Sequence, residues 1–393
     1  MSFIIGIIGL ILVLGLSFLI SSNRKNIQLR PLVVMLVLQF LLGFILLRTT
    51  FGTTLVSGLA DVFAALLSFA QSGVTFVFGG IANKGEAPFF LTVLMPIVFI
   101  SAIIGILRYI KVLPFFMKWV GLGLSKINGL GKLESYNGIA SAILGQSEVF
   151  ISVKKELPFL SEKRLTTMSI SAMSTVSMSI VGSYMALLEP RYVITALVMN
   201  LFGGFIISSI VNPYQLEEQE DELVIEEDGQ QTFFQMLGEY ILDGFHVAIT
   251  VAAMLIGFVA LIALINFIFS KITGLTFQEI LGYVFAPLAF ITGIPWNEAV
   301  DAGSLMATKL VTNEFVAMTE LANGSWDFSG RTTAIVSVFL VSFANFSSIG
   351  IISGAMKGLN EEKGNLVAKN GLKILLSATL VSFLSAIVTG LIF

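Results

Sequence analysis

The chain has 393 residues, of which 56% are hydrophobic and 12% are charged, and its formal net charge is −3. A soluble domain normally has about 25% charged residues, so this composition, with a mean hydropathy of +0.93, indicates an integral membrane protein. The sequence has no cysteine and one histidine, which excludes thiol catalysis, disulfides and metal sites built from several such ligands. It has no basic patch of the kind that binds nucleic acid, so no nucleic-acid partner is expected.

Apolar runs long enough to cross a bilayer recur along the chain. They cover 3–20, 32–47, 88–107, 165–188, 192–211, 247–269, 332–356 and 370–392. The first run has no basic residue before it and no small-residue cleavage site, so it is interpreted as a retained span. Residues 55–80 are apolar but interrupted by polar residues, which is typical of an interfacial helix. The sequence therefore predicts an all-α, multi-pass protein of the plasma (inner) membrane with about eight transmembrane helices.

Two regions, 112–163 and 276–325, fit no simple span because they mix apolar turns with glycine, proline, asparagine and acids. Non-helical backbone is tolerated at membrane depth only where it is buried in protein or lines a cavity. We therefore predict two re-entrant helical hairpins, with tips near Gly145-Gln146-Ser147-Glu148 and Pro295-Trp296-Asn297-Glu298. Each hairpin precedes a span rich in small hydroxyl residues, and two such halves indicate the inverted repeat of a secondary transporter.

These elements predict a division of the chain into scaffold and transport parts. Residues 217–228 hold eight acids and no base, a composition typical of a solvated linker. The expected parts are scaffold helices with the interfacial helix (1–110), the first hairpin and transport helices (111–213), the acidic linker (214–232), a further scaffold helix (233–272), and the second hairpin and transport helices (273–393).

The polar groups at the two predicted tips favour binding of a solute. An ionisable side chain inside a bilayer costs roughly 2.5–3.5 kcal/mol on insertion scales and is usually retained for a function. Glu148 and Glu298 accept hydrogen bonds, whereas Gln146 and Asn345 both accept and donate. Because no intramembrane lysine or arginine is expected to pair with an anion, the set suits a neutral, hydroxylated solute. The alternative is that these groups only join helices.

Two further features leave alternatives open at the level of single residues. Glu314 is interpreted as a ligand, a gate or a partner of Lys309, which lies about one turn earlier. Gly145-Gln146-Ser147 resembles the start of a nucleophile elbow, but the closing glycine of that motif is absent. We therefore do not expect an enzyme.

Four ordered motifs resemble those of the concentrative nucleoside transporters, the family of the bacterial nucleoside permeases. They are Gly145-Gln146-Ser147-Glu148, Ile294-Pro295-Trp296-Asn297-Glu298-Ala299, Asn313-Glu314-Phe315-Val316-Ala317 and Phe343-Ala344-Asn345-Phe346-Ser347-Ser348-Ile349. The resemblance covers essentially the whole chain. It implies a symporter in the lipid bilayer that imports nucleosides by elevator-like alternating access and assembles as a homotrimer. Transport of another hydroxylated solute, or a nucleoside-sensing or channel-like role, is the alternative.

The resemblance also implies roles for individual residues. The nucleobase would be contacted by Gly145, Gln146, Ser147, Glu148 (through water) and the apolar wall Ile180. The ribose hydroxyls would be held by Glu298, Asn345 and Ser348, with Phe343 close by. Purine or pyrimidine preference stays open at this point.

The resemblance is weakest at the ion site. Sodium-coupled members carry Asn at the position of Ser141 and Ser at that of Thr175, and carbonyls equivalent to those of Leu144 and Val176 complete the shell. A serine hydroxyl reaches less far than an asparagine amide, so we favour a proton over sodium as the coupling ion. Because a buried carboxylate binds a proton more readily, the candidate carriers are Glu148, Glu298 and Glu314. No cofactor or metal is expected beyond such a cation.

Overall fold

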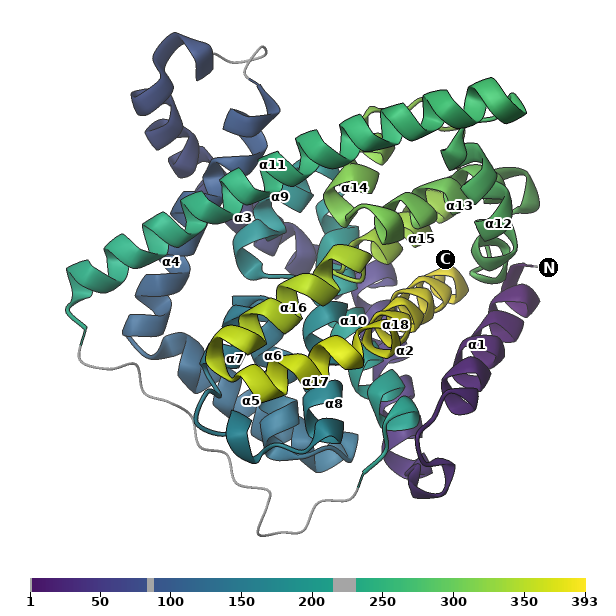
Figure 1. The fold of residues 1–393 in the computed structure, drawn as a ribbon, viewed down its shortest axis with the longest axis horizontal. Coiled ribbons are helices and arrows are strands. Elements are labelled where there is room, and N and C mark those ends of the chain that lie inside the picture. Colours follow the sequence, from purple (N-terminus) through teal and green to yellow (C-terminus); the bar gives the residue numbers. More distant parts are fainter. Residues whose placement is uncertain (1, 83–87, 215–230) are drawn as a thin grey trace.

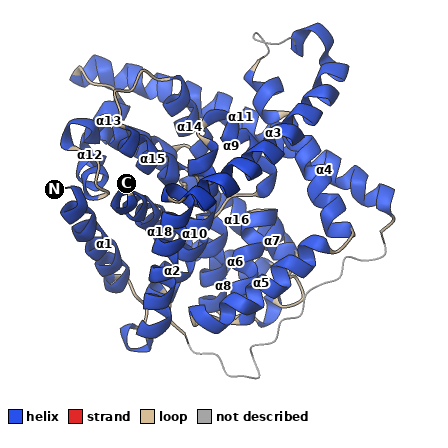
Figure 2. Cartoon of the chain, turned by 180° about the vertical axis from the view of Figure 1, so that it is seen from behind, coloured by secondary structure: helices blue, strands red, loops and turns tan. Residues whose placement is uncertain are grey.

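The computed structural model describes residues 2–82, 88–214 and 231–393, and all regular secondary structure in these ranges is helical (Figures 1 and 2). Within them, seven helical stretches are long and apolar enough to cross a membrane, or eight if one bent pair is counted. The predicted all-α multi-pass architecture is thereby confirmed. The acidic residues 217–228 of the predicted linker lie outside the described ranges.

Five helices precede the two repeated sets described below: four come before the first set and one comes before the second. They are α1 (Ser2–Leu19), α2 (Leu29–Arg48), α3 (Thr50–Phe78), α4 (Pro96–Tyr109) and the 41-residue α11 (Phe233–Thr273). Short turns η1 (Arg24–Asn26), η2 (Gly79–Ala82), η3 (Phe90–Leu94) and η4 (Leu157–Phe159) lie between helices. Figure 1 shows α11 crossing the whole molecule, and it packs along α4.

The stretch predicted to be an interfacial helix, 55–80, is helical in the structure, and its placement at the membrane interface stays a prediction. Thr49 caps a single helix, α3, by accepting a hydrogen bond from the Gly52 amide at 3.0 Å. The helix then runs without a break for 29 residues and is long and apolar enough to cross a membrane. The polar residues in this stretch do not end the helix because their side chains leave its backbone hydrogen bonds intact.

The remaining helices form two sets in the same order. The first set is α5 (Val112–Asn128), α6 (Lys132–Leu144), α7 (Glu148–Ile151), α8 (Glu162–Ser174), α9 (Met178–Leu187) and α10 (Pro190–Val211). The second set is α12 (Phe277–Ile291), α13 (Trp296–Val311), α14 (Glu314–Asn323), α15 (Gly330–Leu340), α16 (Phe346–Leu359), α17 (Glu361–Lys369) and α18 (Gly371–Ile392). Only α17 has no counterpart in the first set.

Packing follows this repeat. In the first set α6 packs on α8 and α8 packs on α10, and in the second set α13 packs on α15 and α15 packs on α18. The two last helices, α10 and α18, pack against each other near the centre of the view in Figure 1. The buried apolar residues form two large clusters, and each contains residues of both sets: one joins α9 and α10 to α13, α14, α15 and α18, and the other joins α6, α7 and α8 to α16, α17 and α18.

Two spans predicted as continuous, 165–188 and 332–356, are broken in the structure. Residues 175–177 separate α8 from α9, and residues 341–345 separate α15 from α16. In each case a polar side chain opens the second half-helix: Ser177 Oγ accepts from the Ser179 amide at 3.3 Å, and Asn345 Oδ1 accepts from the Ser348 amide at 3.0 Å. A capping side chain satisfies amides that a continuous helix would pair internally, so it stabilises the break.

The predicted hairpins correspond to α6–α7 and to the group α12–α13–α14. The first break, 145–147, coincides with the expected first tip. In the second half the chain breaks twice, at 292–295, where α12 and α13 are bent by 115° to each other, and again at 312–313. By its place in the repeat, the break at 312–313, and not the predicted tip at Pro295, is the counterpart of the first tip.

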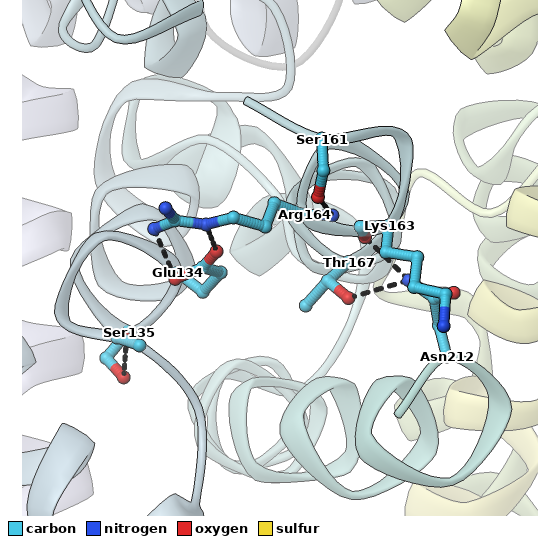
Figure 3. A network of polar contacts seen from close by, with 8 residues as sticks. Glu134, Ser135, Ser161, Lys163, Arg164, Thr167 and Asn212 are labelled. Carbon is cyan, nitrogen blue, oxygen red and sulfur yellow. Dashed lines mark hydrogen bonds and ion pairs between the residues drawn. The ribbon is translucent and has the colours of Figure 1, made fainter. Parts of the chain in front are cut away.

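A buried ion pair joins α6 to α8 (Figure 3). The guanidinium of Arg164 donates from Nη2 to Glu134 Oε2 at 3.1 Å and from Nε to Glu134 Oε1. Beside it, Asn212 at the end of α10 donates to the Lys163 carbonyl at 2.6 Å and to Thr167 Oγ1 at 3.1 Å. These contacts hold the base of the first tip to the helices behind it.

This pair generates the first prediction. Arg164→Met leaves the Glu134 carboxylate buried without its partner, and removing one member of a buried pair costs about 3–5 kcal/mol. We expect a clearly lowered midpoint when unfolding of the detergent-purified protein is followed by heating. The double variant Glu134→Leu/Arg164→Met, which leaves no unpaired charge, should recover most of the loss. A double variant no more stable than Arg164→Met would contradict this assignment.

Candidate functional site

The first break places backbone and a carboxylate in close contact. Gly145 has a φ of 114°, and a Cβ there would lie 2.7 Å from Glu148 Oε2 and 3.1 Å from Ser177 Cβ. Only glycine adopts this conformation without strain and fits this space. Ser147 Oγ donates to Glu148 Oε2 at 3.3 Å. The tip of the first half thus presents an amide, a hydroxyl and a carboxylate next to the break between α8 and α9.

The second half holds a carboxylate between two neutral donors. Glu314, the first residue of α14, accepts from the Tyr184 hydroxyl at 2.8 Å through Oε1 and from Asn345 Nδ2 at 3.0 Å through Oε2. All three side chains are buried. Because Asn345 also caps α16, one amide fixes both the start of that half-helix and the orientation of the carboxylate.

The two halves meet at their breaks. The Phe343 amide donates to the Thr175 carbonyl at 3.2 Å, which joins the break of α15–α16 to that of α8–α9. α9 packs against both α6 and α14, and α16 packs against α7. The structure therefore brings together the first tip, the break at 312–313 and the two interrupted helices, whereas the sequence-based prediction paired the first tip with the stretch at Pro295–Glu298.

Two buried polar atoms in this region have no hydrogen-bond partner among the described residues: Gln146 Oε1 and Ser348 Oγ. Gln146 is 7% exposed and Ser348 is 1% exposed. Leaving such atoms unsatisfied is costly, so most buried polar atoms in native proteins find a partner. The pair points to a hydroxylated or amide-bearing ligand that would supply the missing hydrogen bonds. Ile180, also buried, and the partly buried Phe343 provide apolar surface in the same region.

The structure does not bring Glu298 to this group. Glu298 lies in the first turn of α13, where its Oε2 accepts from the Ser329 amide at 3.0 Å and from Ser329 Oγ at 3.1 Å. α13 continues to Val311, so Glu298 is about 20 Å along the helix from the break that precedes Glu314. The carboxylate that accompanies Asn345 is that of Glu314.

The candidate ion ligands are buried, but their hydroxyls are engaged with their own helices. Ser141 Oγ donates to the Asn137 carbonyl at 2.6 Å, and Thr175 Oγ1 donates to the Ser171 carbonyl at 3.2 Å. Leu144 ends α6, and Val176 lies in the break after α8. The backbone positions are thus close to the polar region, whereas the two hydroxyls make local contacts.

Sequence reasoning missed two residues of this region. Tyr184 belongs to no motif, although it follows Ile180 by four residues on α9 and so shares its helix face. From the sequence, Lys309 is interpreted only as a possible partner of Glu314, and no intramembrane lysine is expected. The structure buries it to 1% exposure in the last turn of α13.

Comparison with known proteins identifies the family. The sequence profile described as the C-terminus of Na⁺-dependent nucleoside transporters matches residues 192–390, the corresponding N-terminal profile matches 8–81, and a profile described as nucleoside recognition matches 90–191. The chain belongs to the concentrative nucleoside transporter family. The resemblance predicted from the four motifs is confirmed, and with it a multi-pass transporter of the plasma membrane.

Several relatives are similar over their full length. The purine nucleoside transport protein NupG of Bacillus subtilis is 36% identical and covers 100% of this chain and 99% of its own. The nucleoside permease NupC of Helicobacter pylori is 29% identical over 99% of this chain and 98% of its own. CNTnw in an inward-facing, substrate-bound state is 30% identical with a TM-score of 0.94, covering 100% of this chain and 98% of that one. A doubly substituted CNTnw in an outward-facing state also has a TM-score of 0.94.

The contact between Tyr184 and Glu314 generates the second prediction. Tyr184→Phe removes one donor from the carboxylate, and a hydrogen bond to a charged group contributes about 1.5–3 kcal/mol. We expect nucleoside affinity to fall roughly 10- to 150-fold, measured by calorimetric titration of the purified protein. Tyr192→Phe serves as a control, because the Tyr192 hydroxyl accepts a hydrogen bond from Arg191 and lies outside the group around Glu314. If Tyr184→Phe binds the nucleoside with the same affinity as the wild type, the hydrogen bond from Tyr184 to Glu314 does not contribute to binding.

Proposed function

We propose that this protein imports nucleosides across the plasma membrane by cation-coupled, elevator-like alternating access. The observation that carries the proposal is the convergence of the four helix breaks around Glu314, Asn345 and the two unsatisfied atoms Gln146 Oε1 and Ser348 Oγ. The family assignment supports nucleoside transport, and similarity to both inward- and outward-facing structures supports alternating access. A channel-like protein on this scaffold would equilibrate the solute without concentrating it.

The ribose and the nucleobase would occupy opposite sides of the convergence. Glu314, Asn345 and Ser348 offer an acceptor, an amide and a hydroxyl for the ribose hydroxyls, with Phe343 beside them. Gly145, Gln146, Ser147 and Glu148 at the first tip would face the nucleobase, with Ile180 as its apolar wall. In this proposal Glu314 takes the role that the motif-based interpretation gave to Glu298, because only Glu314 reaches Asn345.

We further propose that the nucleobase is a purine. The support is the 36% identity to a purine nucleoside transport protein over the whole of both chains. Uptake of adenosine or guanosine would then be inhibited weakly by uridine or cytidine. The resemblance to the family also implies a homotrimer. In both α3 and α11, only 11% of the most apolar window is buried within the chain. The exposed apolar faces of these two helices are available for contact with other subunits or with lipid.

For the coupling ion we propose a proton carried by Glu148. Ser141 offers a hydroxyl oxygen close to its own helix, where it donates to the Asn137 carbonyl, in place of the longer asparagine amide of sodium-coupled members. Glu148 lies at the tip and has a hydrogen bond to one neighbouring hydroxyl, that of Ser147, whereas Glu314 has two fixed donors. Sodium is the second candidate, favoured by the description of the matching family profiles.

The choice between the two carboxylates of α13 and α14 generates the third prediction. Glu314→Gln replaces one carboxylate oxygen by an NH₂ group, which cannot accept from the Tyr184 hydroxyl or from Asn345 Nδ2. The change also removes an acceptor for the ribose hydroxyls. We expect nucleoside affinity to fall by roughly 10- to 150-fold for each lost hydrogen bond. Glu298→Gln makes the same chemical change about 20 Å away along α13 and should bind within about twofold of the wild type. Titration of both purified variants with adenosine checks this, and the reverse pattern would restore Glu298 to the ribose site.

The ion assignment generates the fourth prediction. Wild-type protein in liposomes should accumulate labelled adenosine on an inward proton gradient and not on a sodium gradient. Ser141→Asn supplies the amide oxygen present in sodium-coupled members, and we expect it to accumulate adenosine on a sodium gradient. Wild-type accumulation driven by sodium alone would favour the second candidate. Failure of the wild type to accumulate any nucleoside under either gradient would remove the proposed function.

A further inference from the structure

Lys309 is a charged side chain enclosed by oxygen atoms inside the transport helices. Its ammonium donates to the Phe339 carbonyl at 2.6 Å, to Ser342 Oγ at 2.7 Å and to Ser382 Oγ at 3.1 Å. The same nitrogen lies 4.5 Å from the centre of the Phe339 ring. All three N–H donors of the ammonium are therefore used, and each acceptor is a neutral oxygen, as in the coordination shell of an alkali cation.

The surroundings of Lys309 have negative electrostatic potential from two helix ends. Lys309 is in the last turn of α13, and Phe339 is in the last turn of α15. Carbonyls at the end of a helix carry the negative end of its dipole. Glu314 opens the next half-helix five residues later. The second half thus contains one carboxylate and one ammonium at the same break.

The first half has the carboxylate without the ammonium. Glu148 opens α7 after the first break, as Glu314 opens α14 after the second. The last turn of α6 carries no basic residue, and neither does that of α8. Ala142, third from the end of α6, stands where Lys309 stands in α13. An unpaired charge within the protein is costly. Glu148 is partly buried, its side-chain partner is the neutral Ser147 hydroxyl, and no basic side chain of the described residues forms an ion pair with it, so the carboxylate favours the binding of a mobile cation.

From this asymmetry we infer that Lys309 is a tethered counter-cation: its ammonium neutralises the second half, so that only the first half requires a mobile cation during transport. The inference rests on the proposed function of cation-coupled nucleoside import. It assigns Lys309 as a positioning residue that fixes the number of coupling ions, because the ammonium occupies the oxygen-lined position of the second half. The mobile cation, whether proton or sodium, belongs to the first half alone.

The test measures how much charge moves with each nucleoside. Nucleosides such as adenosine are neutral, so current divided by labelled adenosine flux gives the number of coupled cations. Wild-type protein in liposomes should give a ratio of one. Lys309→Asn removes the tethered cation but leaves Phe339, Ser342 and Ser382 as oxygen donors, so a second mobile cation is needed and the ratio should rise to two. Lys309→Arg keeps the charge and should keep a ratio of one.

Cation dependence provides a second measurement. Lys309→Asn should gain activation by sodium chloride, with choline chloride as the replacement salt, because its vacated oxygen-lined position can take a sodium ion, whereas the proton-coupled wild type should show no such activation. The unfolding midpoint of Lys309→Asn in detergent should rise with sodium chloride more than that of the wild type. Lys357→Asn, on an exposed position of α16, is the matched control and should behave as the wild type. A ratio of one with unchanged sodium dependence in Lys309→Asn would overturn the inference.

A reciprocal variant keeps the test decisive if Lys309→Asn does not insert in the membrane. Ala142→Lys places a tethered cation in the first half, at a position that is only partly buried. It should equilibrate adenosine across the liposome membrane without concentrating it, because no mobile cation is then required. Continued accumulation by Ala142→Lys would overturn the inference. Loss of accumulation in the wild type itself would instead reject the proposed function.

Discussion

The geometry of the candidate site follows from one constraint: backbone amides and carbonyls at the four helix breaks must find hydrogen-bond partners within the protein. Each interruption frees amides and carbonyls that a membrane interior cannot hydrate. The chain satisfies them with Ser177 and Asn345 as caps and with the hydrogen bond from the Phe343 amide to the Thr175 carbonyl. Because Asn345 Nδ2 also donates to Glu314, the same contacts that stabilise the breaks orient the carboxylate. Asn345 therefore both stabilises the start of α16 and orients the Glu314 carboxylate.

Charge is distributed unequally between two halves that are otherwise built alike. Glu314 has two neutral donors and shares its break with the ammonium of Lys309. Glu148 has the hydroxyl of its neighbour Ser147 and a glycine whose missing Cβ leaves space beside the carboxylate. A carboxylate with fixed partners serves as a constant acceptor, whereas one with few partners responds to an added cation. In the proposed function, both halves contact the nucleoside, and the mobile cation is assigned to the half whose carboxylate has fewer fixed partners.

Much of the fold follows from the sequence because apolar runs and breakers act locally. The spans, the first tip at Gly145 and the two-fold order of the elements were predicted from such runs. Local signals could not rank the two breaks of the second half, since Pro295 and Asn313 both interrupt helices and Glu298 and Glu314 both follow them closely. Only tertiary contact shows that Glu314 meets Asn345 and that Glu298 meets Ser329. Tyr184 and Lys309 were missed for the same reason, because their partners lie on distant helices.

Burial separates the helices that carry the chemistry from those that surround them. In α10 and α18, 78% and 83% of the most apolar window is buried in the chain, against 11% in α3 and α11. Glu148 lies on α7, which packs on α6, whereas Lys309 and Glu314 lie on α13 and α14, which pack on α15. Because α6 packs on α10 and α15 packs on both α10 and α18, the three charges belong to one bundle. If that bundle moves as a unit during alternating access, its fixed charges return with it and add nothing to the net transfer. The charge carried across the membrane is then set only by what binds to the bundle in one orientation and leaves it in the other.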